Sequence, residues 1–203
     1  MSICEIKSSN YGNENMENPE EINERELMDY YEYKGRFGKA KLKLQLLRSW
    51  ILQFLASISP SSNLAVIFQR ARGVKIGGHV FLGPNVSIDL LYPTLVTIED
   101  YVSIGMNSMI FVHSNPTCSM YLKKHHYPRT VAPVTIRRGA WIPPGTIILH
   151  GVTIGENSVV GAGSLVLNDV EPFTMVAGVP AKPVKKLEKR DDKGNENTRL
   201  HSR

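Results

Sequence analysis

The residues best suited to chemistry in this sequence are a histidine and an aspartate, each at a point where a regular pattern is interrupted. Asp89 opens the shorter interruption, and His113 immediately precedes the longer one. A neutral imidazole, whose ordinary pKa is about 6.5, can take a proton from a hydroxyl group and pass it to a leaving group. A carboxylate on its other nitrogen would fix the tautomer that this requires. Asp89 is the candidate for that partner, and the alternative is a corner aspartate that caps its own turn.

The interrupted pattern is an aliphatic residue, here called an anchor, at every sixth position. Three runs carry it without a gap: Ile76, Leu82 and Ile88; Ile98, Ile104 and Ile110; and Ile136, Ile142, Ile148, Ile154, Val160 and Val166. A small or β-branched residue stands at the fourth place after most anchors, and glycine often follows directly, which relieves crowding of the backbone. This period fits neither an α-helix nor an alternating strand. It predicts an all-β solenoid with three six-residue faces per turn, and the twelve anchors give about four coils.

The two interruptions predict loops that leave this solenoid. Four extra residues lie around 90–93, and twenty extra residues lie roughly at 114–132. Insertions in solenoids project outward from one face, which is commonly the working face. We therefore expect a β-helix domain over residues 73–180 with a loop insertion at 114–132. Residues 181–203 predict a basic cap with a short helix, followed by a disordered tail.

Two segments of opposite charge precede the solenoid. Residues 1–34 carry nine acidic and three basic side chains and predict a flexible arm with a short helix near 20–33. Residues 35–72 predict an amphipathic helical segment, in which a helix over 36–58 ends before Pro60. Its apolar residues recur at helical spacing: Leu44, Leu47, Ile51, Phe54 or Leu55, and Ile58. Its first half is basic and contains Lys39, Lys41, Lys43 and Arg48. Such a helix can pack on its own protein or a neighbouring subunit, or lie on an anionic membrane surface, and the sequence leaves both open.

Composition and cysteine usage exclude several classes of protein. Apolar residues make up 42% of the chain, which excludes wholesale disorder. Cys4 and Cys118 form no disulfide framework and no zinc-ligand spacing, so we expect free thiols in a cytoplasmic protein. The start has no signal-peptide pattern, and the longest uncharged stretch, 49–69, is too polar to span a membrane. The net charge of +5 comes without a nucleic-acid-binding motif, so we expect no nucleic acid partner.

The second half of the solenoid resembles the hexapeptide-repeat acyltransferases. Its most specific stretch is VTIGENSVVGAGSLV followed by NDV and AGVPAK, and IEDYVSIGMNSMIFVHS resembles the segment that ends in the family's catalytic histidine. The resemblance covers about residues 70–187, and the family includes galactoside, maltose, serine and streptogramin O-acetyltransferases. It implies a left-handed parallel β-helix, an exception to the right-handed crossover rule. It also implies a homotrimer, in which acetyl-CoA and the acceptor meet between adjacent prisms.

The resemblance further implies roles for individual residues. His113 matches the catalytic histidine, which would accept the acceptor's proton as the hydroxyl oxygen attacks the thioester carbonyl of acetyl-CoA. Positions that meet acetyl-CoA in the family are matched by Trp141, Ala162, Lys182, Lys185 and Lys186. The implied activity is O-acetyl transfer to a hydroxyl of a sugar or glycoconjugate, as in polysaccharide biosynthesis, in the cytoplasm or at the inner membrane face. No metal is expected, because zinc-binding relatives need two histidines five residues apart, and no pair here has that spacing.

Two departures from the family pattern affect the acyl-donor site. Pro143 and Pro144 stand where the family usually has glycine, and proline offers no backbone N–H to the thioester. Leu167-Asn168 replaces a frequent Thr-Lys pair, which removes one phosphate contact. These departures leave open a different acyl group and a catalytically weak scaffold. Serine or an antibiotic is the alternative acceptor to a sugar. Among the other histidines, His79 is expected to be structural at a turn, and His150 is assigned no role. His125 and His126 lie in the long loop, where surface positions are expected and contact with the acceptor stays open.

Overall fold

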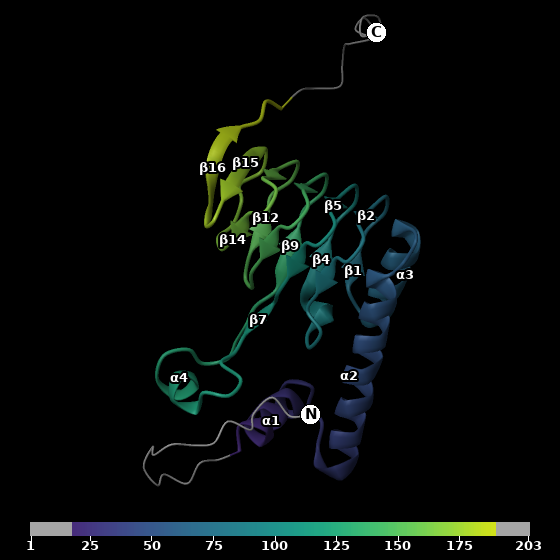
Figure 1. Ribbon diagram of the computed structural model, residues 1–203, viewed down its shortest axis with the longest axis vertical. Coiled ribbons are helices and arrows are strands. Elements are labelled where there is room, and N and C mark those ends of the chain that lie inside the picture. The colour runs from purple at the N-terminus through teal and green to yellow at the C-terminus, as the bar shows by residue number, and fades with distance from the viewer. Residues whose placement is uncertain (1–17, 190–203) are drawn as a thin grey trace, which may run out of the picture.

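The computed structural model describes residues 18–189, in which short parallel strands stack into a three-sided prism with helices at one end (Figure 1). One side is a sheet of β1 (Lys75–Ile76), β4 (Val96–Ile98), β9 (Val134–Ile136) and β12 (Thr153–Ile154). The second side contains β2 (Phe81–Leu82), β5 (Ser103–Ile104), β10 (Trp141–Ile142), β13 (Val159–Val160), β15 (Thr174–Gly178) and β16 (Ala181–Lys186). The third contains β3 (Ser87–Ile88), β6 (Met109–Ile110), β11 (Ile147–Ile148) and β14 (Leu165–Val166).

The anchors form the interior of this prism. Eleven of the twelve are at most 2% exposed, and Ile76 in the first coil is partly buried. Anchors pair with anchors of the next coil, as Ile98 does with Ile136, so the inward position predicted for them is confirmed. The chain turns at the third place after an anchor, where Asn107 and other residues have a positive φ, and the small residue at the fourth place then points inward. Glycine directly after an anchor permits close stacking, because a Cβ on Gly105 would lie 2.4 Å from a backbone nitrogen of the next coil.

The solenoid ends in an antiparallel hairpin. Strand β15 pairs in parallel with β13, and β16 then returns antiparallel to β15. Residues 181–186 are therefore a strand, and the prediction of a short helix there was wrong. Pro183 cannot donate a helical hydrogen bond, whereas the free edge of β15 offers pairing to the returning chain. The hairpin carries the sheet beyond the expected boundary at residue 180, and the tail expected to be disordered lies outside the described residues from 190 onward.

Three helices precede the prism: α1 (Pro19–Tyr30), α2 (Gly35–Ser57) and α3 (Ser62–Arg72). The Asn18 side chain caps α1 by accepting from the amide of Glu20, and the Ser61 side chain caps α3 by accepting from the amide of Leu64. Helix α2 confirms the helix expected over 36–58, and α3 is a second helix within the expected segment 35–72. The two helices pack on each other and on the first coil. No helix within residues 18–189 has both the length and the apolar character to cross a bilayer.

The rotation of α2 decides which of its sides packs on the chain. Its buried residues are Gly38, Leu42, Ser49 and Ala56, while the apolar stripe that includes Leu47 is exposed. The helix therefore packs on its own protein, as one of the two alternatives held, but it does so through the side opposite the stripe. Polar contacts fix the rotation: the Ser49 hydroxyl donates to the backbone oxygen of Leu90 at 2.8 Å, and the Gln53 amide donates to the backbone oxygen of Val86 at 3.0 Å.

The long insertion meets the N-terminal helix beside the prism. It contains β7 (His113–Ser114) and β8 (Thr130–Val131), which pair antiparallel, and α4 (Met120–His125) between them (Figure 1). The shorter insertion contains a single 3₁₀ turn, Pro93–Leu95. Glu26 of α1 forms ion pairs of 2.6 Å with both Lys123 and Arg129 of the long insertion. Residues 18–34 are therefore packed on the insertion, unlike the flexible arm that was expected, and residues 1–17 lie outside the described chain.

Candidate functional site

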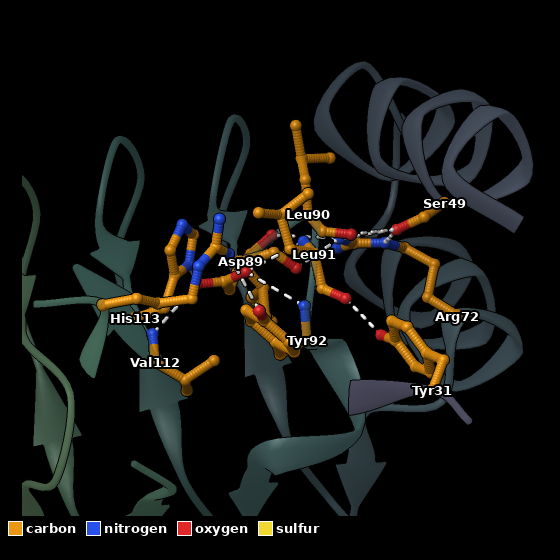
Figure 2. Close-up of polar contacts among 11 residues, drawn as sticks. Tyr31, Ser49, Arg72, Asp89, Leu90, Leu91, Tyr92, Val112 and His113 are labelled. Carbon is orange, nitrogen blue, oxygen red and sulfur yellow. Dashed lines mark hydrogen bonds and ion pairs between the residues drawn. The ribbon is translucent and has the colours of Figure 1, made fainter. Parts of the chain in front are cut away.

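Asp89 and His113 meet at a corner of the prism. Asp89 follows β3 and His113 follows β6, which is the next strand of the same sheet. The Oδ2 atom of Asp89 lies 2.5 Å from Nδ1 of His113 (Figure 2). The carboxylate is fully buried, while 21% of the His113 side chain is exposed. This contact occupies Nδ1 and leaves Nε2 as the nitrogen available for proton transfer.

The Asp89 carboxylate has four hydrogen-bond donors. Its Oδ1 accepts from the backbone amides of Leu91 at 2.9 Å and Tyr92 at 3.1 Å, and its Oδ2 also accepts from the amide of Val112 at 3.0 Å. Asp89 therefore caps its own turn with one oxygen and holds His113 with the other, so both alternatives left open by the sequence are present. Burial alone would raise the pKa of Asp89, but the hydrogen bonds from His113 and the backbone outweigh it and hold this pKa below its usual range. The ionised carboxylate favours the tautomer with the proton on Nδ1.

Arg72 ties the helices to the same corner. Its Nη2 donates to the backbone oxygens of Ile88 at 3.1 Å and Asp89 at 2.7 Å (Figure 2). The same guanidinium donates to the Ser49 hydroxyl at 3.2 Å and to Oε1 of Gln53 at 2.5 Å, both on α2. Burial lowers the pKa of Arg72 to about 10, and Asp89 opposes that shift, so the group remains charged at neutral pH. The backbone of the dyad aspartate is thus held by a charged residue from outside the prism.

The Tyr92 ring packs beside the His113 ring. The two rings lie edge to face with centroids 5.4 Å apart, and the Tyr92 hydroxyl accepts from Nη1 of Arg129 at 2.9 Å. Arg129 in turn donates through Nε to Glu26 at 2.6 Å. Burial raises the pKa of Tyr92, although the Arg129 cation opposes this, so the hydroxyl stays protonated. Burial also raises the pKa of Glu26, but the hydrogen bonds from Lys123 and Arg129 outweigh it and leave that pKa lowered.

The residues expected to meet acetyl-CoA lie on other parts of the prism. Trp141 is 55% exposed on β10, and Ala162 is exposed in the turn between β13 and β14. The exposed basic residues of β16 belong to the same sheet as Trp141: Lys182, Lys185 and Lys186. His113 instead extends from the third sheet, so one chain does not place these residues and the dyad on the same side. The backbone oxygen of Pro143 accepts from the hydroxyls of Ser108 at 3.2 Å and Thr146 at 2.9 Å, which explains how this proline fits the corner.

Four residues near the dyad had no role predicted from the sequence: Arg72, Tyr92, Glu26 and Lys123. A signal existed for Tyr92, which lies in the short insertion that Asp89 opens. The other three act through contacts between segments far apart in the chain, which no local pattern reveals. His125 and His126 are exposed and pack against Tyr121, with ring centroids 5.0 and 5.5 Å apart. Residues 18–189 contain no group of three or more His, Cys, Asp or Glu side chains arranged to hold a metal ion.

Comparison with known proteins identifies the class of this fold and site. Residues 133–168 match the family described as bacterial transferase hexapeptide (six repeats). A putative acetyltransferase of Staphylococcus aureus is 30% identical over 67% of this chain and 67% of its own length. The galactoside O-acetyltransferase of Escherichia coli K12 is 35% identical over 62% of this chain and 60% of its own length. The solved structure of a galactoside acetyltransferase in complex with coenzyme A is 25% identical with a TM-score of 0.55, covering 72% of this chain and 82% of that one.

The chain belongs to the hexapeptide-repeat transferase family. Its parallel sheets and its anchor period agree with the left-handed β-helix that this family implies. The chain spans about three fifths of the length of the curated relatives it matches, including 60% of the galactoside enzyme.

Proposed function

We propose that this protein is an acetyl-CoA-dependent O-acetyltransferase and that His113 is its general base. The observation that carries the proposal is the 2.5 Å contact between Asp89 and His113, which fixes one ring nitrogen and frees the other. Relatives named as acetyltransferases and a related structure that contains coenzyme A support the reaction class. Function here rests on the site as well as on the fold, because this fold serves several acceptors.

The proposed reaction proceeds through Nε2 of His113. This nitrogen takes the proton of the acceptor hydroxyl while the hydroxyl oxygen attacks the carbonyl carbon of the thioester. As the tetrahedral intermediate collapses, the carbon–sulfur bond breaks and Nε2–H protonates the thiolate of CoA. Asp89 stays ionised throughout, orients the ring and stabilises the imidazolium. Positioned base catalysis of this kind contributes about 10²–10⁴-fold to the rate.

The donor site is proposed to lie between two copies of the chain. In this arrangement Trp141 and Ala162 of one left-handed prism, of about four coils, line the path of the pantetheine arm toward the His113 of a neighbouring copy. Lys182, Lys185 and Lys186 meet the CoA phosphates. The separation of these residues from the dyad within one chain supports a site shared between copies, and the family resemblance supports a homotrimer.

The acceptor is proposed to be a sugar or glycoconjugate hydroxyl. The name of the galactoside relative supports a sugar acceptor. The Tyr92 ring lies beside the His113 ring, and its buried hydroxyl accepts from Arg129, so these two side chains shape the surroundings of His113.

Thiol release from acetyl-CoA tests these proposals. We expect wild-type protein to release CoA in the presence of a sugar from a panel that also contains serine and streptogramin-type alcohols. His113→Ala should lower that rate by about 10²–10⁴-fold, because the base is lost. His79→Asn, at an exposed turn of a different corner of the prism, is the control and should retain the rate. An unchanged rate in His113→Ala would refute the base, and folded wild-type protein that releases no CoA with any acceptor would favour the scaffold.

A further inference from the structure

Helix α2 presents its largest apolar side chains to solvent. We call this set the outer stripe, and its members are Phe37, Leu44, Leu47, Trp50, Ile51, Phe54 and Ile58. Phe37 is 92% exposed and Trp50 is 57% exposed. The stripe runs for about 30 Å along the helix, since an α-helix rises about 1.5 Å per residue. An exposed apolar surface of this extent on a folded protein marks a contact site.

A rotation of α2 that buried the outer stripe would break the hydrogen bonds on the opposite side of the helix. Ser49 and Gln53 on the opposite side of α2 bind the backbone of the first coil and the buried guanidinium of Arg72. Gly38 and Ala56 on that side allow close packing, because neither has a bulky side chain. The structure therefore fixes the rotation of α2 through small and polar residues and leaves the large apolar residues outside.

The charge around the stripe indicates what it contacts. No Asp or Glu occurs anywhere from Gly35 to Ile88. At 3.6 residues per turn, Arg36 and Lys43 lie within the arc of the stripe, and Lys41 and Arg48 lie along one long edge of it. An apolar stripe that contains and borders basic side chains matches an anionic bilayer, in which the acyl region takes the apolar side chains and the headgroups take the cations. A symmetric contact between two such stripes would instead bring like charges together.

We propose that the outer stripe docks the protein on an anionic membrane surface. Figure 1 shows α2 and α3 at the β1 end of the stack, so the stripe faces away from the strands. Ile67 of α3 is also exposed and enlarges the apolar area at this end. In the proposed trimer, with the prism axes parallel, the three outer stripes lie at one end of the assembly. This clustering of three stripes rests on the proposal that the protein is a trimer. The docking of a single chain does not depend on it.

Flotation of the full-length protein with vesicles tests the docking. The vesicles are pure phosphatidylcholine, or phosphatidylcholine with about a third of phosphatidylglycerol. We expect flotation with the anionic vesicles only, and we expect added salt to weaken it. The doubly substituted Leu47→Asn, Phe54→Asn protein should lose flotation, and Arg36→Gln with Lys43→Gln should weaken binding about fivefold per charge removed. Val184→Asn, an exposed apolar residue on β16 at the far end of the prism, is the matched control and should float as wild type does.

Two outcomes would overturn the docking proposal. One is equal or absent flotation with both vesicle types. The other is a change in the solution mass of the Leu47→Asn, Phe54→Asn protein, which would assign the stripe to contacts between copies of this chain. The assay contains neither acetyl-CoA nor acceptor, so its result is independent of the proposed catalysis. Circular dichroism and the urea midpoint of the stripe variant should match those of wild type, which shows that the protein is folded.

Discussion

The prism and helix α2 use the same large aliphatic residues in opposite ways. In the prism, Ile142, Ile148 and the other anchors point inward, and the outward positions are taken by residues of many kinds. In α2, Leu44 and Leu47 point outward, and polar or small residues such as Ser49 face the body. The difference shows that burial follows from the neighbours that an element meets. A coil always meets the next coil, whereas one side of α2 meets nothing in the described chain.

Substitution of an anchor should have the largest effect on stability. Ile148→Ala removes a side chain that is fully buried between neighbouring coils, and we expect a loss of about 2–5 kcal/mol in the free energy of unfolding. Leu47→Ala in the outer stripe is the matched change and should alter stability by about 0.5 kcal/mol or less. Urea unfolding followed by circular dichroism measures both. Equal losses would mean that the stripe is buried in solution.

Arg72 joins the two regions, and its removal should affect both stability and catalysis. Arg72→Met leaves the backbone oxygens of Ile88 and Asp89 without their buried donor, so we expect a loss of about 1–3 kcal/mol. Because these oxygens belong to the strand end that carries the dyad, kcat should fall and the pH profile of kcat/KM should shift. Arg70→Met is the control: Arg70 is exposed and donates to Ile76 and Gly77 at a different corner. A pH profile that matches wild type would restrict Arg72 to a structural role.

Asp89 should make the stability of the prism corner depend on pH. Its pKa is lowered in the folded state, so the unfolded state takes up protons first as the pH falls through about 4. The stability that Asp89 contributes is therefore present above that range and is lost below it. Asp89→Asn should flatten this acid limb of the stability curve and lower kcat. Urea midpoints of both proteins between neutral and acidic pH measure the difference, and parallel curves would contradict it.

The smallest effect is expected at the contact between α1 and the insertion. Glu26→Gln removes the charge that pairs with Lys123 and Arg129, and a partly exposed pair of this kind contributes about 1 kcal/mol or less. We expect a raised KM for the acceptor with little change in KM for acetyl-CoA, because Arg129 holds the hydroxyl of Tyr92, whose ring packs beside the His113 ring. Glu24→Gln, on the same helix, is the control. Equal changes in both KM values would mean that the contact is not specific to the acceptor side.

Sequence reasoning predicted the prism well because its core is local and periodic. The six-residue period predicts that each anchor is buried, and the insertions that interrupt the period indicate the corner where Asp89 and His113 meet. The rotation of α2 could not be predicted, because it depends on hydrogen bonds from Ser49 and Gln53 to residues more than thirty positions later. The same holds for Arg72, whose position at the end of α3 gives no sign of the backbone oxygens that it binds.

The ion pairs between α1 and the insertion also constrain the order in which the chain folds. Glu26 and Lys123 are 97 positions apart, and Glu26 and Arg129 are 103 positions apart. During synthesis, α1 leaves the ribosome long before its partners exist, while each coil of the prism needs only its nearest neighbour. The contacts of Arg129 with Glu26 and Tyr92 beside His113 therefore form late, after the first coils have formed and the insertion has emerged. A nascent chain that stops short of the insertion would carry stacked coils and an α1 whose acidic face still lacks its cations.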